Sequence, residues 1–129
     1  MDFSHSERSR QYQETLRAFM DEHVYPAEPL AETQRAAAGA ESTPALAELK
    51  HVARDRGLWN LFLPGTEWGV GLSNVEYAPL AELMGRSIEL APEATNCSAP
   101  DTGNMEVLAD FGTPDQQQSW LVPLLNGEI

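Results

Sequence analysis

"QYQETLRAFMDEHV", from Gln11 to Val24, places large apolar residues at helical spacing. Their 3.6-residue period puts them on one face of a helix. The alternation of apolar and polar residues that is typical of strands is nearly absent elsewhere in the chain. The sequence therefore predicts an all-α fold, an orthogonal or up-and-down bundle of about five to six helices. The apolar face of the first helix comprises Tyr12, Leu16, Phe19, Met20 and Val24.

Capping residues and prolines predict where the helices begin and end. Ser4 and Glu7 fit a capping box, and we expect Pro26 and Pro29 to interrupt the first helix. The small, polar stretch from Ala31 to Thr43 then predicts a connection or a frayed helical tail rather than core. Later helix starts are predicted at Thr43 with Pro44, at Ser73 with Glu76, at Pro92, at Asp101 after the break at Pro100, and at Thr113 with Pro114.

The second helix is expected to end near Gly57, and a glycine-rich segment follows, "LWNLFLPGTEWGVGLSN", Leu58 to Asn74. It predicts a loop that its large apolar residues anchor in the core. Besides the first helix, four sets of residues are expected to pack together: Leu46, Leu49 and Ala53; Trp59, Leu61, Phe62 and Leu63; Tyr77, Leu80, Ala81, Met84 and Ile88; and Trp120, Leu121, Leu124 and Leu125.

Composition excludes several classes of partner. The 129 residues include 8 basic and 20 acidic ones, a net charge of -12, which leaves no cationic surface for nucleic acid or anionic lipid. No segment fits a membrane span or an export signal, so we expect a cytoplasmic protein. Cys97 is the single cysteine, which excludes an internal disulfide and leaves two interpretations, a small buried residue or a reactive thiol.

No self-contained active site emerges from local motifs. A di-iron bundle needs two Glu-x-x-His pairs, and the chain offers one, Glu48 with His51, on the helix side opposite the apolar stripe. His5 and His23 are expected on the surface. We therefore expect no self-contained active site and no metal-ligating residue in this chain.

"CSAPDTGNMEVL", from Cys97 to Leu108, has mostly small and polar residues, a proline and a glycine at positions where a helical core would use large apolar residues. Two interpretations are open. Pro100 and Asp101 end one helix and cap the next, or the small residues leave room for a ligand.

Two long phrases resemble the acyl-CoA dehydrogenase family. The first is "RGLWNLFLPGTEWGVGLSNVEYAPLAELMGRS", Arg56 to Ser87, with the family's "G-L-W" step and glycine-rich loop. The second, "NCSAPDTGNMEVLADFGTPDQQQSWLVPLLNGEI", Asn96 to Ile129, contains its "G-T-x-x-Q-x-x-x-x-L-x-P-L-x-x-G-E" signature. "NCSAPDTGNMEVL" is similar to the long-chain branch of family members ten and eleven.

The resemblance implies that residues 1–129 form the helical N-terminal domain of a longer enzyme, whose β-domain and C-terminal helical domain lie outside this chain. In that family FAD accepts a hydride during α,β-desaturation of an acyl-CoA thioester, and the glutamate base belongs to the C-terminal domain. It also implies a long-chain or branched acyl-CoA substrate, an electron acceptor such as electron-transfer flavoprotein, and a homo-oligomeric full enzyme. The resemblance therefore implies no catalytic and no cofactor-binding residue in this chain, which alone is expected to be inactive and to bind no FAD.

The same resemblance assigns this chain one wall of the cleft that holds the acyl chain. The expected wall comprises Asn96, Ala99, Pro100, Gly103 and Asn104. Two other classes of function stay open, a freestanding acidic helical interaction module and a small helical carrier of a metal or ligand.

Overall fold

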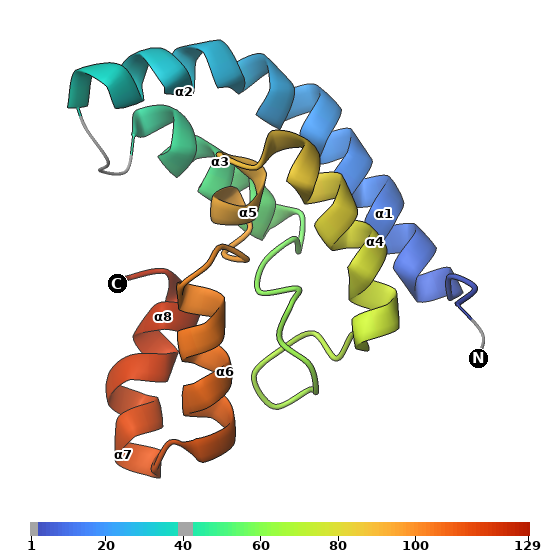
Figure 1. Ribbon diagram of the computed structural model, residues 1–129, viewed down its shortest axis with the longest axis vertical. Helices are drawn as coiled ribbons and strands as arrows, with labels where there is room; N and C mark the ends of the chain where they lie inside the picture. The colour runs from blue at the N-terminus through green and yellow to red at the C-terminus, as the bar shows by residue number, and fades with distance from the viewer. Residues whose placement is uncertain (1–2, 39–42) are drawn as a thin grey trace.

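A long helical segment at the N-terminus organises the chain (Figure 1). The structure is a computed structural model that describes residues 3–38 and 43–129, and within these ranges it contains helices and no strand. The all-α prediction is confirmed. The elements are α1 (Glu7–Phe19), η1 (Met20–Val24), α2 (Tyr25–Ala38), α3 (Pro44–Asp55), α4 (Asn74–Met84), η2 (Gly85–Ser87), α5 (Ala91–Ala94), α6 (Asp101–Phe111), α7 (Pro114–Gln116), η3 (Gln117–Leu121) and α8 (Val122–Asn126).

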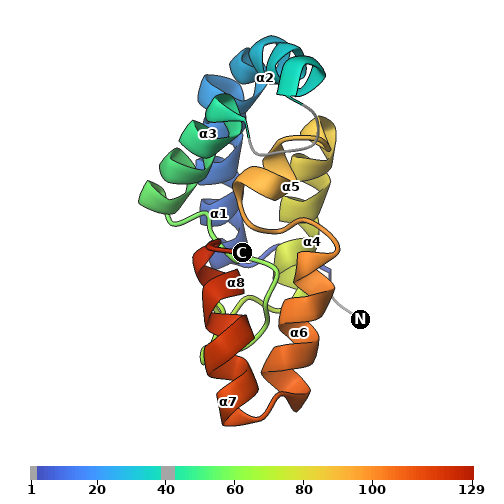
Figure 2. The same ribbon diagram turned by 90° about the vertical axis from the view of Figure 1, so that its left-hand side faces the viewer.

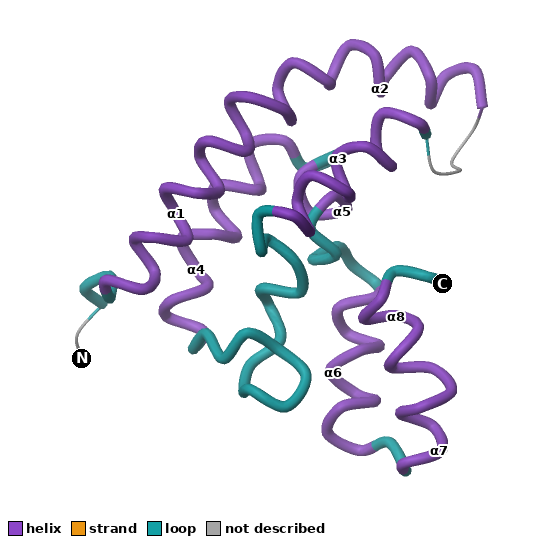
Figure 3. Tube along the Cα trace, turned by 180° about the vertical axis from the view of Figure 1, so that it is seen from behind, coloured by secondary structure: helices purple, strands orange, loops and turns teal. Residues whose placement is uncertain are grey.

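The helices form two groups. In the main bundle, α1 through α5, α1 packs along α4, α2 on α3, and α3 on α5. In the second group, the hairpin, α6 lies beside the continuous segment α7, η3 and α8 (Figure 2). The central loop, residues 56–73, passes between α4 and the hairpin (Figure 3). The pieces join into six continuous helical segments within the described residues, as predicted.

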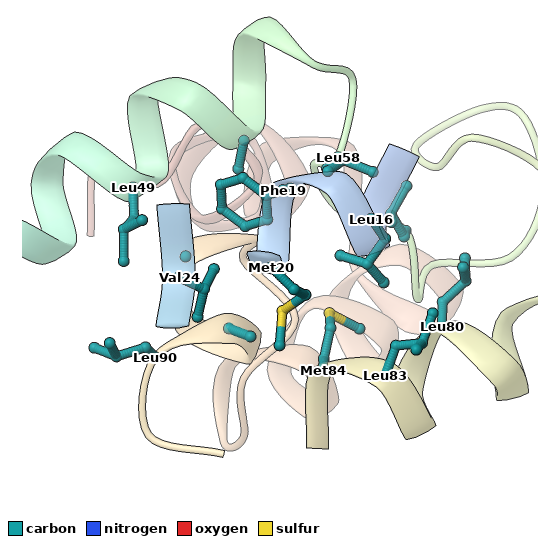
Figure 4. Close-up of a cluster of buried hydrophobic side chains, with 14 of the residues drawn as sticks. Leu16, Phe19, Met20, Val24, Leu49, Leu58, Leu80, Leu83, Met84 and Leu90 are labelled. Carbon is teal, nitrogen blue, oxygen red and sulfur yellow. The ribbon is translucent and has the colours of Figure 1, made fainter. Parts of the chain in front are cut away.

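The core of the main bundle is built on the predicted face of the first helix. Leu16, Phe19, Met20 and Val24 are buried, and Tyr12 packs at the edge of the cluster. Met20 and Met84 point toward one another across the core (Figure 4). Each fully buried side chain of this size contributes about 1.5 to 3 kcal/mol relative to its exposed state, which is why this face dominates the fold.

The first helix does not end at Pro26 and Pro29, contrary to the prediction; it continues to Ala38. A proline ring clashes with the carbonyl four residues earlier, which for Pro26 is that of Glu22. Glu22 lies in η1, a π-helical turn whose wider spacing displaces that carbonyl. The same device recurs at Pro123, whose fourth preceding residue, Ser119, lies in the π-helical turn η3. Pro26 and Pro123 are therefore each accommodated without ending the helical segment in which they lie.

Two predictions near the first helix need correction. The N-cap of α1 is Ser6 instead of Ser4, with Ser6 Oγ accepting from Ser9 N at 3.1 Å. The stretch from Ala31 to Thr43 is helical to Ala38, which agrees with the predicted helical tail, but Ala31 is buried and so belongs to the core. Residues 39–42 lie outside the described residues.

The other predicted helix starts are confirmed with one exception. Thr43 caps α3, Ser73 and Glu76 form a capping box on α4, and Thr113 caps α7; Pro92 lies in the first turn of α5. At α6 the cap is Pro100 without a side-chain hydrogen bond, and Asp101 is the first helical residue.

Three residues expected in the core are exposed: Ala81, Ile88 (73%) and Trp120 (57%). On α4 the buried face is Leu80, Leu83 and Met84, which turns Ala81 away from the core. Ile88 follows Ala81 by seven residues and therefore lies on the same outward side, while Ser87 takes the buried position. Trp120 lies in the π-helical turn η3, whose wider spacing shifts it relative to the buried Leu121. The remaining predicted core residues are buried or partly buried: Leu46, Leu49, Ala53, Trp59, Leu61, Phe62, Leu63, Tyr77, Leu80, Met84, Leu121, Leu124 and Leu125.

Replacing Leu16, which is fully buried, tests the importance of the first helix. We expect Leu16→Ala to lower the free energy of unfolding by about 2 to 5 kcal/mol, because it leaves a cavity in the core. Leu30→Ala, at a half-exposed leucine of α2, is the matched control and is expected to change it by less than about 0.5 kcal/mol. Urea denaturation measures both; equal losses would contradict this account of the core.

The carboxylate of Glu76 predicts a specific pH dependence. It accepts from Ser73 N (2.9 Å), Ser73 Oγ (3.0 Å) and Ser6 Oγ (2.7 Å), and these hydrogen bonds lower its pKa in the folded chain. Because the folded pKa is below the unfolded one, the stabilisation is present above the unfolded pKa and is lost as pH falls through the folded pKa.

Glu76→Gln is therefore expected to flatten the dependence of unfolding free energy on pH in the acidic range. Denaturation by urea at a series of pH values from about 7 to about 3 measures it. Glu82→Gln, at an exposed position of the same helix, supplies the control. An unchanged slope in Glu76→Gln would show that this carboxylate does not stabilise the start of α4.

Candidate functional site

The expected acyl wall lies at the start of the hairpin. Pro100, Gly103 and Asn104 share one face of α6, at positions i, i+3 and i+4, and are exposed together with Ala99. A Cβ built on Gly103 would meet no atom within 4 Å, so this face opens onto free space. Asn96 is half-buried, and its amide points toward the end of α8.

An apolar groove continues from this face along the hairpin. It has a volume of about 470 Å³ and lies between α6 and the segment η3 to α8. Val107 and Trp120, which are 59% and 57% exposed, stand at its opening. Among its lining residues, the sequence predicts only Asn104 as part of the acyl wall. The helical spacing of Asn104, Val107 and Leu108 is a signal for the α6 side of the groove, but not for the side formed by η3 and α8. The lining comprises Asn104, Val107, Leu108, Trp120, Leu124 and Ile129.

A second cleft, on the other side of α6, has acidic walls. It has a volume of about 530 Å³, and Glu67, Glu106 and Asp110 line it. The indole nitrogen of Trp68, another lining residue, is buried without a hydrogen-bond partner among the described residues. Three carboxylates around one cleft oppose the binding of a phosphate group. Of the two clefts on the hairpin, the apolar groove is therefore the one suited to an uncharged alkyl chain.

Cys97 lies between the two cores, beside Tyr77. Its Sγ donates to Thr95 O at 3.3 Å, and burial raises the pKa of its thiol. Burial likewise raises the pKa of Tyr77, with the neighbouring Cys97 contributing. A neutral, partly buried thiol is a poor nucleophile, which favours the interpretation of Cys97 as a packing residue.

The three histidines lie apart from the apolar groove. His51 is exposed and pairs with Asp55 at 3.2 Å, while Gln13 Nε2 lies 3.1 Å from His5 Nδ1. Arg56 Nη2 lies 2.8 Å from His23 Nε2 and donates to Glu22 at 2.7 Å, which lowers the pKa of Glu22. In residues 3–38 and 43–129, no three His, Cys, Asp or Glu side chains are grouped closely enough to hold a metal ion.

The hairpin is attached to the rest of the chain through the end of α8. The last carbonyls of a helix have no partner within it. Here side chains distant in sequence donate to them, and we name this set, Arg54, Trp59, Asn60 and Asn96, the clamp. Trp59 Nε1 donates to Leu125 O at 2.7 Å, Asn60 Nδ2 to Leu125 O at 3.0 Å, Asn96 Nδ2 to Leu124 O at 3.0 Å, and Arg54 Nη2 to Asn126 O.

Gly127 completes this contact. Its φ is +65°, a left-handed conformation that favours glycine, and it ends α8. A Cβ there would lie 2.7 Å from Arg54 Nη2 and 2.9 Å from Trp59 Cζ2. The Arg54 guanidinium stacks over the Trp59 ring, 4.0 Å from its centroid, so the three residues form one packed unit.

The "G-L-W" step and the "L-x-P-L-x-x-G-E" signature thus meet in one contact, and comparison with known proteins agrees with the family that they indicate. The model of the acyl-CoA dehydrogenase N-terminal domain matches residues 6–128. The chain belongs to the acyl-CoA dehydrogenase family. No helix of the described ranges in this acyl-CoA dehydrogenase domain is long and apolar enough to cross a membrane.

Relatives in this family include a bacterial and a mammalian protein. The chain is 54% identical to the probable acyl-CoA dehydrogenase FadE2 of Mycobacterium tuberculosis, over 100% of this chain and 32% of that protein. It is 49% identical to acyl-CoA dehydrogenase family member 10 of Mus musculus, over 93% of this chain and 12% of that protein. The resemblance to family members ten and eleven is confirmed.

A solved structure supports the same assignment. The structure of a putative acyl-CoA dehydrogenase from Mycobacterium abscessus matches 98% of this chain and 33% of its own, with 48% identity and a TM-score of 0.86. The chain therefore spans about a third of the length of that protein and of FadE2.

A substitution at Gly127 tests the clamp of this acyl-CoA dehydrogenase domain. We expect Gly127→Ala to lower the free energy of unfolding by about 1 to 3 kcal/mol, because alanine is strained at this φ and its methyl group displaces Arg54 and Trp59. Gly85→Ala is the control, since Gly85 is right-handed with free space around it, and is expected to stabilise by up to about 1 kcal/mol. Urea denaturation of both variants decides; an equal response would contradict the clamp geometry.

The environment of Cys97 predicts slow alkylation. In the native chain we expect iodoacetamide to react with Cys97 more slowly than with the same thiol in urea-unfolded chain, because burial raises the pKa of this thiol and limits access to it. Mass spectrometry of timed samples measures the rates. Native alkylation as fast as that of the unfolded chain would support the alternative of a reactive thiol.

Proposed function

We propose that this chain is the N-terminal domain of an FAD-dependent acyl-CoA dehydrogenase and contributes one wall of its acyl-binding cleft. The observation that carries the proposal is the exposed face of α6, where Pro100, Gly103 and Asn104 lead into a groove without ionised side chains. Small residues leave room, and an apolar groove favours an alkyl chain over a charged group. Ala99 and Asn96 extend the proposed wall toward the main bundle.

The chemistry of the full enzyme is α,β-desaturation of an acyl-CoA thioester, as in fatty acid oxidation. In this proposal the catalytic glutamate and most contacts with FAD belong to a β-domain and a C-terminal helical domain outside these 129 residues. Bound FAD supplies the hydride acceptor. The residues of this chain bind and orient the alkyl part of the substrate and exclude water from it.

The distribution of charge limits what this domain contributes. The acidic cleft of Glu67, Glu106 and Asp110 beside α6 disfavours the phosphates of coenzyme A, so the proposed contact is with the acyl tail. We propose long-chain or branched acyl-CoA as the substrate, electron-transfer flavoprotein as the electron acceptor, and a homo-oligomeric full enzyme. Neither nucleic acid nor a membrane surface is a proposed partner, because the chain carries a net charge of -12.

A chimera tests the proposal. This chain replaces the matched third of FadE2, and the product is assayed for flavin absorbance and for acyl-CoA-dependent reduction of an artificial electron acceptor across a series of chain lengths. We expect activity in the chimera and none in the 129-residue chain alone. Gly103→Leu in the chimera is expected to raise KM for the longest substrates by about tenfold while sparing short ones, since it fills the open space beside α6.

Ala47→Leu, at an exposed position on α3, adds the same side chain away from the groove and serves as the control. A uniform effect of Gly103→Leu on all chain lengths would contradict the acyl wall. A folded chimera that neither holds flavin nor turns over would favour the freestanding acidic interaction module. Metal analysis of the purified chain tests the third class, a small carrier of metal.

A further inference from the structure

Two asparagines with unusual backbone conformations meet at the base of the hairpin. Asn60 and Asn96 both have a φ of +55°, and they are the described residues other than glycine in the left-handed region. Asparagine tolerates this region better than most residues, yet it still costs free energy. Because two such residues contact each other, we infer that the structure needs the side chains of Asn60 and Asn96 at the base of the hairpin.

The contact between them is direct and extends to α8. Asn96 Nδ2 donates to Asn60 Oδ1 at 2.6 Å and to Leu124 O at 3.0 Å. Asn60 Nδ2 donates to Leu125 O at 3.0 Å, and its backbone N donates to Thr95 O at 3.1 Å. One pair of side chains thus joins the start of the central loop, the end of α5 and the last turn of α8.

Few other directional contacts orient the hairpin. Its helices pack mainly on one another, and its apolar face rests on Phe62 and Leu63 of the central loop through Met105 and Leu121. Apolar contacts of this kind are non-directional and tolerate sliding and rotation. Hydrogen bonds between fixed partners do not tolerate sliding or rotation, because their distances and angles are restricted. The orientation of α6 therefore depends on the clamp.

We propose that Asn60 and Asn96 are positioning residues that set the orientation of the hairpin relative to the main bundle. The effect on the substrate rests on the proposed function: by holding α8, the pair places Pro100, Gly103 and Asn104 at the distance that the acyl chain requires. Asn96 then acts through the position of α6, and its own amide stays on Leu124 O and Asn60 Oδ1.

The experiment uses backbone residual dipolar couplings of the isotope-labelled 129-residue chain, which report the orientation of α6 and α8 relative to α1 and α4. In the parent chain one alignment tensor is expected to fit both groups of helices. Asn96→Asp keeps the shape of the side chain but replaces its donor with a carboxylate facing two acceptors. We expect the hairpin couplings to lose their fit to the tensor of the main bundle while still agreeing with one another.

Two further variants make the result decisive. Asn96→Gly retains the left-handed backbone without the amide and is expected to release the hairpin too; it replaces Asn96→Asp if that variant fails to fold. Gln118→Glu, an exposed change from amide to carboxylate on η3, is the control and is expected to keep a single tensor. A single tensor in folded Asn96→Asp, or in Asn96→Gly if the first does not fold, overturns the proposal.

The chimera separates this inference from the proposed function. If both hold, Asn96→Asp raises KM for long acyl-CoA by about tenfold with little change in kcat for short substrates, because the wall is misplaced. A released hairpin with unchanged KM supports the positioning role of the pair and counts against the acyl wall. An altered KM with a single tensor overturns the positioning role.

Discussion

The architecture depends on the last carbonyls of α8 finding donors elsewhere in the chain. Trp59, Asn60 and Asn96 supply them, so the end of the chain is joined to the beginning of the central loop and to the end of α5. Without Trp59 and Asn60, Leu125 O would need another donor, because a buried carbonyl without a partner costs free energy. Leu124 O also accepts from Gly127 N at 2.9 Å, so Asn96 adds a second donor there. The hairpin bears the proposed acyl wall, and in our proposal these hydrogen bonds set its orientation, while apolar contacts with Phe62 and Leu63 hold it against the central loop.

The family signature can be read as a series of physical constraints on this same region. At Gly112 a Cβ would lie 2.4 Å from Leu108 O, Thr113 and Gln116 form a capping box, and Leu121 is fully buried. Pro123 follows a π-helical turn, and Gly127 takes a left-handed conformation against Trp59. Each of these positions has a structural role in the geometry of the hairpin, as expected if the reactive groups belong to other domains, as we propose.

The candidate site was only partly predictable. The small residues of α6 were apparent from "CSAPDTGNMEVL", because they stand where a helical core would use large ones. The apolar groove was not, since Trp120 was expected in the core and the π-helical turn η3 carries it outward. The wall residues and the groove share only Asn104, so the connection between them requires knowing how α6 and α8 lie side by side.

The sequence by itself determined the helical class and the buried face from Leu16 to Val24. It also determined the helix caps at Thr43, Ser73 and Thr113. Each of these features depends on residues within a few positions of one another. Tertiary structure decided the rest. The passage of the helix through Pro26 depends on a π-helical turn stabilised by packing, and the meeting of Asn60 with Asn96 joins residues 36 positions apart. Such contacts leave no periodic signal in the sequence, since they arise only when separate helices are brought together.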